Sequence, residues 1–297
     1  MKPKLYIYAA SANIWPVDQH PLELKQLVKE LWGKSYRRIC HFIELALVGA
    51  KRCVTGTSVP IEPDCDLVFA SGQGNVSQVV KVTQQIFKEH QPPMPFDFMH
   101  IPNNMAPFYV AQALELNSSN LTVAHRAFPF ETAVDLVCMS SAPGKQYLIG
   151  AVDECAFPLE QHRLRLNLPA DTLLAEGSHW LLTGGDVKHA IAQVEFCIFA
   201  SSLDDLLLCL AEQDTGANST LACGFGINVQ EQQALSQQLN LKNTYDYRQV
   251  AAYHDTAAAY AIASFIDSST DEQRIRTLIH INKSSQQRYC AIAVTVL

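Results

Sequence analysis

The sequence predicts an α/β fold made of two similar halves, and three observations support this. Short apolar runs recur along the chain, each with a stretch of helical periodicity before or after it. The pattern begins again after Gly185, so that the chain divides near residues 184–192. No low-complexity linker separates the two parts. We therefore expect an N-terminal half over residues 1–184 and a C-terminal half over residues 185–297, packed as one body.

The elements of the first half follow from its apolar runs. Leu5–Ala10 is β-rich, and Arg37–Cys53 has apolar residues at helical spacing that indicate a largely buried helix. Asp66–Ala70 predicts a strand, followed by a glycine-rich turn and a helix over Val76–Lys88. That order indicates a crossover unit in a mostly parallel sheet. The other elements expected here are a helix at Met105–Leu116, a strand at Leu121–Ala124, a helix at Phe130–Ser140 and strands at Tyr147–Val152 and Trp180–Thr183.

The second half repeats the alternation and should end in a hairpin of two strands. Its expected elements are strands at Ala192–Phe199 and Ser219–Cys223, helices at Leu203–Ala211, Glu231–Leu239 and Thr256–Ile266, and hairpin strands at Arg276–Asn282 and Tyr289–Val296.

Composition excludes several classes of protein. With 48% hydrophobic and 17% charged residues the chain is globular, and its net charge of −7 argues against nucleic acid as a partner. The nine cysteines form no CxxC pair, which is typical of reduced thiols in a reducing compartment. The apolar run at the N-terminus is too short for a signal peptide core or a membrane span. We therefore expect a cytoplasmic protein.

Common catalytic and cofactor motifs are missing. Gly72-Gln73-Gly74 lacks the dinucleotide-binding and P-loop patterns and indicates a tight turn, and Ser71 does not stand in a G-x-S-x-G elbow. Asp153 and Glu154 are neighbours on a predicted strand, where they would project to opposite faces and make a poor acid–base pair. No His, Cys, Asp or Glu cluster has metal-ligand spacing, so we expect neither a metal nor a cofactor.

Four segments carry a resemblance to one family. They are Leu67–Val76 (LVFASGQGNV), Met94–Ala106 (MPFDFMHIPNNMA), Ala175–Leu182 (AEGSHWLL) and Tyr253–Tyr260 (YHDTAAAY). These are similar to the motifs vxxSxxGe, SPxxFxxSVxNxxAG, xEGAaxLvL and GxxxTAsA of the β-ketoacyl synthase family, and specifically of its short, divergent branch associated with aryl-polyene-type pathways. The resemblance implies the thiolase-like fold, with two α/β halves layered α-β-α-β-α.

The resemblance also implies where a nucleophile would lie. The family writes its catalytic cysteine as TVxxACSSS, at the start of a helix whose dipole and free N–H groups activate the thiol. The matching stretch here is Thr122–Phe130 (TVAHRAFPF), and Ala127 occupies the cysteine position. Alanine cannot form an acyl thioester, and the nearest cysteine, Cys138, is eleven residues further on.

Two histidines complete the family's site, and only one has a counterpart here. The first belongs to a glycine-rich loop that reads Cys223–Asn228 (CGFGIN) in this chain and offers no histidine. His254 lies near the second position, either as a remnant of catalysis or as a hydrogen-bonded structural residue.

Other side chains are candidates for an interface or an acyl tunnel. His100, Asn103 and Asn104 fall in the segment that the family places near its two-fold axis, although Asn hydrogen bonds within a turn would explain them equally well. The aromatic side chains Phe108, Phe128 and Phe130 would line or block a tunnel, or simply pack in the core.

Three functions remain open from the sequence. The first is a non-catalytic subunit resembling a chain length factor, which would pair with an active ketosynthase and receive an acyl carrier protein in type II fatty acid or polyketide synthesis. The second is an enzyme of this class that retains condensing or malonyl-decarboxylating activity with His254. The third is a homodimeric protein that binds acyl thioesters.

Overall fold

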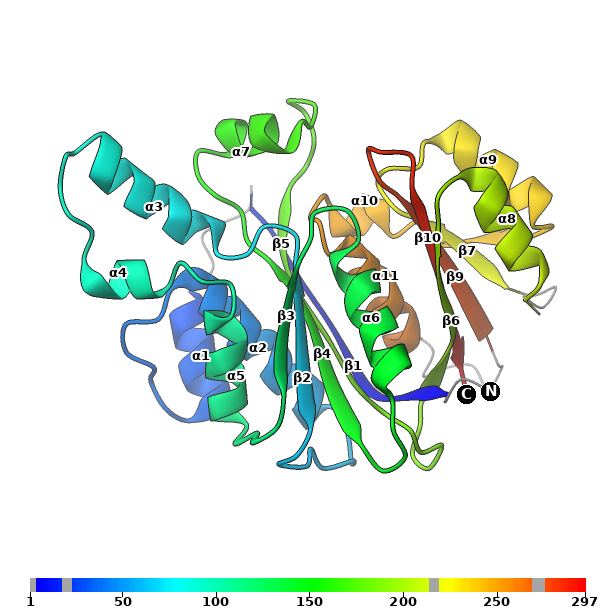
Figure 1. The fold of residues 1–297 in the computed structure, drawn as a ribbon, viewed down its shortest axis with the longest axis horizontal. Coiled ribbons are helices and arrows are strands. Elements are labelled where there is room, and N and C mark those ends of the chain that lie inside the picture. Colours follow the sequence, from blue (N-terminus) through cyan, green and yellow to red (C-terminus); the bar gives the residue numbers. More distant parts are fainter. Residues whose placement is uncertain (1–3, 18–22, 214–218, 269–275) are drawn as a thin grey trace.

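A single mixed sheet runs through the computed structural model (Figure 1). The structure describes residues 4–17, 23–213, 219–268 and 276–297. Within these residues the sheet has ten strands in the order β3-β2-β4-β5-β1-β6-β10-β9-β7-β8. Their bounds are β1 Leu5–Pro16, β2 Asp66–Ser71, β3 Asn120–Ala124, β4 Gln146–Asp153, β5 Ala175–Gly184, β6 Ala192–Ala200, β7 Thr220–Cys223, β8 Asn243–Thr244, β9 Arg276–Lys283 and β10 Tyr289–Val296.

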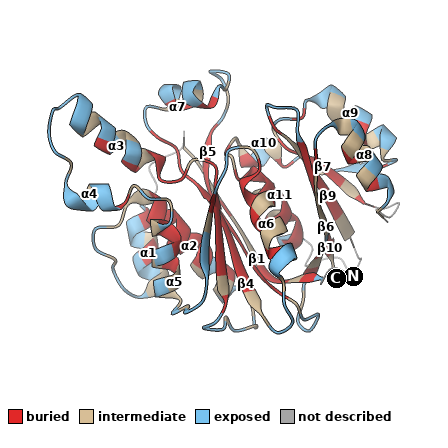
Figure 2. Ribbon diagram, viewed as in Figure 1, coloured by how far each residue is buried: buried red, intermediate tan, exposed pale blue. Residues whose placement is uncertain are grey.

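Helices cover both faces of this sheet and fill the space where it folds on itself (Figure 1). Their bounds are α1 Leu24–Trp32, α2 His41–Thr55, α3 Val76–Phe87, α4 Pro95–Met99, α5 Met105–Ala113, α6 Pro129–Ser140, α7 Leu159–Leu166, α8 Leu203–Ala211, α9 Val229–Gln238, α10 Arg248–Ala251 and α11 Ala257–Asp267. Figure 2 shows that α11 and the middle strands are buried, whereas α4 is mostly exposed and α3 and α7 are partly exposed.

The alternation of side chains along the strands produces the layers, because successive residues of a strand face opposite sides. On β2, Leu67 and Phe69 pack with α1, α2 and α5, whereas Val68 and Ala70 face the core that holds α6 and α11. On β10, alternate residues likewise face either α6 and α11 or the outer helices α8 and α9. The predicted α-β-α-β-α layering is confirmed.

The prediction of a mostly parallel sheet was wrong. Parallel pairing joins β2 to β3 and β4, and β7 to β8 and β9, but β5, β1, β6 and β10 pair antiparallel with their neighbours. Short apolar runs look alike in both kinds of sheet, so local pattern does not decide direction. Strand β1 also extends to Pro16, past the predicted Ala10, because its second part pairs with β5 as far as Ala175.

Other features agree with the sequence. The predicted closing hairpin is present as β9 and β10, and none of the nine cysteines, all of which lie in the described residues, forms a disulfide. Among the described residues, no helix is both long and apolar enough to cross a membrane. Strands β1–β5 lie together on one side of the order and β6–β10 on the other, and they meet where Leu5–Ile7 pairs with Ala192–Val194.

Candidate functional site

The turn between β3 and α6 places Ala127 beside a cavity of about 1030 Å³. Strand β3 ends at Ala124, and Pro129 begins α6, a first-turn position where its missing N–H is not needed. The main-chain N–H of Phe128 donates to Nδ1 of His125 at 3.4 Å, and the hydroxyl of Thr132 donates to the Phe128 carbonyl at 2.7 Å. Both bonds hold the turn that presents the Ala127 methyl group.

Separate parts of the chain meet around this cavity. Its wall brings Ala127, the loop at Gly224–Gly226 and His254 together, although they are far apart in the sequence. Aromatic side chains supply much of the remaining wall: Phe128, Phe199, Phe225, Tyr247 and Tyr253. Among the described residues that line it there is no cysteine. The cavity therefore has no thiol beside the Ala127 turn among its described lining residues.

His254 has a partner that sequence reasoning missed. Its Nε2 lies 2.9 Å from Nε2 of His179, which belongs to β5. Burial lowers the pKa of His254 to about 4, and it also lowers the pKa of His179 well below the usual value, helped by His254. Both rings are therefore neutral at pH 7. A signal was present, because His179 stands where the xEGAaxLvL motif has a small residue.

A pair of buried carboxyl groups lies at the carboxyl end of β4. Oδ1 of Asp153 accepts from Ser71 Oγ and the Gly72 N–H, each at 2.9 Å, and Oδ2 accepts from the Thr256 N–H at 2.7 Å. Asp255, which lines the cavity, accepts from the Tyr253 hydroxyl at 2.9 Å, and a hydrogen bond from the Gln73 side chain also lowers its pKa. These bonds join the carboxyl ends of β2 and β4 to the start of α11, next to His254.

Burial raises the pKa of both aspartates, and the charge of Asp255 raises that of Asp153 further, to about 7. The two groups titrate as a coupled pair. Hydrogen bonds stabilise both carboxylates, from Ser71, Gly72 and Thr256 on Asp153 and from Tyr253 and Gln73 on Asp255, so the first proton belongs to the pair and not to one member. In the sequence, the only carboxylate beside Asp153 is its neighbour Glu154. In the folded chain, the carboxyl group that titrates with Asp153 is that of Asp255.

A further buried acid lies in the first turn of α6. Burial raises the pKa of Glu131 to about 7, although Asn282 Nδ2 donates to its Oε1 at 2.8 Å. The fixed charges near the opening are positive instead: Arg126, Lys283 and Arg288 all line the cavity. The cavity thus combines a neutral, aromatic interior with basic groups.

The other predicted residues lie elsewhere. Phe128 lines the cavity, whereas Phe130 is buried in the core that holds α6. His100 is buried, and its carbonyl accepts from Asn75 Nδ2 at 2.7 Å. Asn103 packs against Gly74, where a Cβ would lie 1.9 Å from its Oδ1. None of His100, Asn103, Asn104 and Phe108 is among the described residues that line the cavity.

Asn104 precedes α5 without a side-chain cap, and Phe108 is half-exposed on that helix. No group of three or more metal-ligating side chains is present among the described residues.

Comparison with solved structures identifies the architecture. The ishigamide ketosynthase/chain length factor superposes with a TM-score of 0.79 at 15% identity, covering 99% of both chains. The chain has the β-ketoacyl synthase fold. A β-ketoacyl synthase from Burkholderia phymatum STM815 gives a TM-score of 0.74 at 10% identity, covering 99% of this chain and 100% of that one.

A third structure contains a carrier protein. It is AntDE:AntF, a type II PKS acyl-carrier protein in complex with its ketosynthase bound to the hexaketide, and it matches with a TM-score of 0.73 at 10% identity over 100% of both chains. No protein-family model and no curated protein sequence matches this chain. The thiolase-like fold that the motifs implied is confirmed.

Proposed function

We propose that this chain is a non-catalytic β-ketoacyl synthase-like subunit, similar to a chain length factor, that pairs with an active ketosynthase in a type II fatty acid or polyketide system. The observation that carries the proposal is the turn before α6, where Ala127 faces a cavity whose described lining residues include no cysteine. Acyl transfer in this fold requires a thiolate at that helix start, and a methyl group cannot replace it.

Exposed apolar side chains support pairing with another protein. Large apolar residues are exposed along the segment from Val79 to Leu121: Val79, Ile86, Phe87, Met94, Phe96, Phe98, Met99, Phe108 and Leu121. We call these residues the 79–121 apolar set. They come from α3, α4, α5 and β3 and the loop between α3 and α4. Monomeric proteins rarely leave so much apolar surface uncovered, which favours an interface.

Strand β3 offers a second feature of an interface. It is the end strand of the sheet and, within the described chain, pairs only with β2. An open edge can accept a strand from another subunit. The edge belongs to the same strand that leads into the Ala127 turn, so pairing there would bring the partner's surface close to the cavity.

Basic groups favour an acidic partner at the cavity. Arg126, Lys283 and Arg288 line it in a chain whose net charge is −7, and of these Lys283 is paired with Glu231, with 2.5 Å between Nζ and Oε1. An acyl carrier protein with a phosphate-bearing arm has the charge that would be attracted to these groups. We therefore include the carrier protein as a partner of the assembled pair.

Co-purification with a ketosynthase tests the pairing. We expect the tagged chain, expressed with a cysteine-containing ketosynthase from its own genome, to elute with that ketosynthase as a 1:1 complex. Replacement of Phe87 and Phe98 by Lys should abolish the complex while leaving the fold intact, because both side chains are exposed. A stable homodimer that does not bind the ketosynthase would favour the acyl-thioester-binding alternative instead.

The substitution Ala127→Cys tests the site assignment. The new thiol would stand at the start of α6, and we expect an acyl thioester to label it at least about tenfold faster than the thiol in Val123→Cys. Val123 is a suitable control because it lines the same cavity from strand β3 and not from the start of a helix. Peptide mapping separates both from the nine native cysteines. Equal labelling of the two variants would contradict the assignment.

One alternative has an observation in its favour. His254 faces the cavity, and decarboxylation of a malonyl thioester needs only a group that stabilises an enolate. Release of labelled carbon dioxide from malonyl-carrier by this chain alone, and its loss in His254→Ala, would replace the proposed function by that enzymatic one.

A further inference from the structure

Two imidazole rings meet beside the cavity. His254 lines the cavity, whereas His179 is not among its described lining residues. Their Nε2 atoms are 2.9 Å apart and their ring centroids 5.1 Å. Gly177 leaves room for the pair, because a Cβ there would lie 2.5 Å from Nε2 of His179 and 2.9 Å from Nε2 of His254. The contact is therefore built into the packing of β5 against the segment before α11.

The proton in this contact belongs to one ring only. Both rings are fully buried and neutral, so a hydrogen bond between the two Nε2 atoms needs one protonated and one bare nitrogen. The carbonyls of Ala252 and Ala251 act to raise the pKa of His254, against the larger effect of burial. Since Nε2 of His254 faces His179, these acceptors favour a proton on its Nδ1, although no acceptor forms a hydrogen bond of normal geometry there.

We propose that His179 is a positioning residue that holds His254 as the Nδ1–H tautomer and donates to its Nε2. Nε2 of His254 then offers neither an N–H nor a lone pair to a molecule in the cavity. Stabilising an enolate requires an N–H aimed at the oxygen, and general base catalysis requires a free lone pair. The inference deepens the proposed function and rests on it for its meaning, because it occupies Nε2 of the buried imidazole that a condensing or decarboxylating reaction could use.

Nitrogen-15 NMR of the full chain, labelled at histidine, tests the tautomers directly. We expect His179 as the Nε2–H form and His254 as the Nδ1–H form between pH 6 and 8, with a coupling across the N–H···N bond. An Nε2–H form of His254 without that coupling, or titration of either ring above about pH 6, would overturn the proposal. This result does not depend on whether a ketosynthase binds. The tautomer assignment can therefore fail while the proposed subunit function stands, and the proposed function can fail while the tautomer assignment stands.

A matched pair of substitutions tests the role of the donor. Gln and Met have similar length, but only Gln can donate a hydrogen bond in place of His179. We expect diethylpyrocarbonate to modify His254 at least about tenfold faster in His179→Met than in the unmodified chain, and within about threefold in His179→Gln. His125 lines the same cavity and is exposed, so its rate should stay constant.

Two outcomes of that experiment would contradict the proposed role of His179. One is modification of His254 in the unmodified chain as fast as that of His125. The other is an equal change in both variants, which would mean that His179 acts only by filling space. If His179→Met does not fold, the tautomer measurement on the unmodified chain decides.

Discussion

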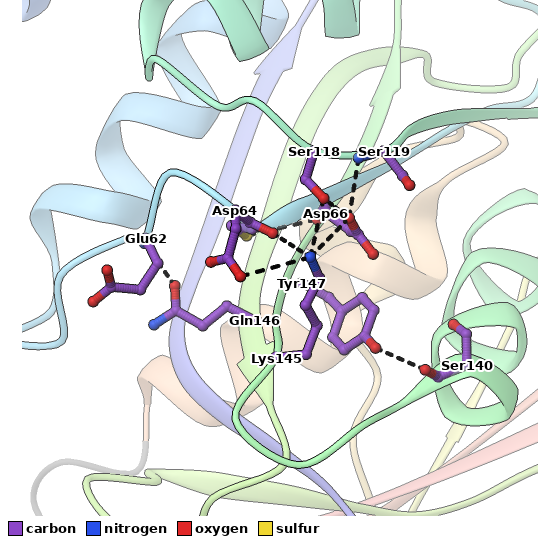
Figure 3. Close-up of polar contacts among 10 residues, drawn as sticks. Glu62, Asp64, Asp66, Ser118, Ser119, Ser140, Lys145, Gln146 and Tyr147 are labelled. Carbon is purple, nitrogen blue, oxygen red and sulfur yellow. Dashed lines mark hydrogen bonds and ion pairs between the residues drawn. The ribbon is translucent and has the colours of Figure 1, made fainter.

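Strands β2 and β4 place aspartates in opposite environments at their two ends. At the amino ends, shown in Figure 3, Asp66 accepts from Ser118 Oγ at 2.5 Å and lies 3.3 Å from Lys145 Nζ, which also contacts the Asp64 carbonyl. Burial alone would raise the pKa of Asp66, but the hydrogen bonds from Ser118 and Lys145 outweigh it, so the pKa is lowered. This end keeps its charge, paired and near water.

At the carboxyl ends the aspartates are removed from water, and the nearby Arg126 and Arg165 lower the pKa of Asp255 less than burial raises it. Asp153 and Asp255 are both buried beside the cavity, and burial raises the pKa of each. Hydrogen-bond donors from three segments hold Asp153, whereas no Lys or Arg forms an ion pair with it among the described residues. The same strands thus have one end that resembles an ordinary protein surface and one end that resembles a functional site.

This difference shows what lies around the cavity. Beside Ala127 there are buried acids, turns fixed by hydrogen bonds and a large volume. Buried acids of this kind cost stability. A cavity kept at such a cost is consistent with the proposed role in shaping an acyl tunnel.

The largest effect should come from removing the acceptor at the carboxyl end. Asp153→Ala leaves the Ser71 hydroxyl and the N–H groups of Gly72 and Thr256 without their partner in a buried place. We expect a loss of about 3–4 kcal/mol in the free energy of unfolding, measured by urea denaturation at pH 7. The matched truncation Asp66→Ala should cost only about 1 kcal/mol, because its partners can turn to water. Equal costs would contradict the comparison.

A smaller effect, with a distinct pH dependence, should follow from Asp255→Asn. A carboxyl group whose folded pKa is raised contributes stability below its unfolded pKa of about 4 and loses it as the pH rises through the folded pKa. Asn keeps an acceptor for the Tyr253 hydroxyl and carries no charge. We expect the variant to match the unmodified chain at pH 4 and to be more stable by about 1–2 kcal/mol at pH 8.

Urea denaturation at several pH values measures this difference. A variant that loses more stability at pH 8 than at pH 4 would mean that Asp255 is held as a paired carboxylate, which would contradict its raised pKa. Asp66→Asn serves as the opposite control. Because the folded pKa of Asp66 is lowered, its contribution is present above about pH 4 and is lost as the pH falls.

The sequence predicted the elements and layers because these depend on local periodicity. The alternating run of β2 and the apolar stripe of α2 carry their own burial pattern, and both were predicted from their residues. Strand direction was not predictable in this way, since β1 and β5 pair antiparallel for reasons that lie in the whole chain. Helix α1 was missed altogether.

Prediction of the site was limited in the same physical sense. Motif order placed Ala127, the loop after β7 and His254 correctly on one cavity, because a family pattern encodes long-range contacts indirectly. His179 and the Asp153–Asp255 pair were missed, because each depends on two segments that meet only in the folded chain. Of these, only His179 left a visible mark, as a large residue at a small position.

The smallest effect should come from the ammonium group at the amino ends. Lys145→Met removes the ion pair with Asp66 and the bond to Ser118, but the Lys145 side chain is 23% exposed and its partners can bind water. We expect a loss of about 0.5–1 kcal/mol at pH 7 in low salt, measured by urea denaturation, and a clearly smaller loss in 1 M NaCl, where charges are screened within about 3 Å. The cost should also shrink below about pH 4, as Asp66 takes up a proton. A loss as large as that of Asp153→Ala, insensitive to salt, would mean that the two ends are built alike.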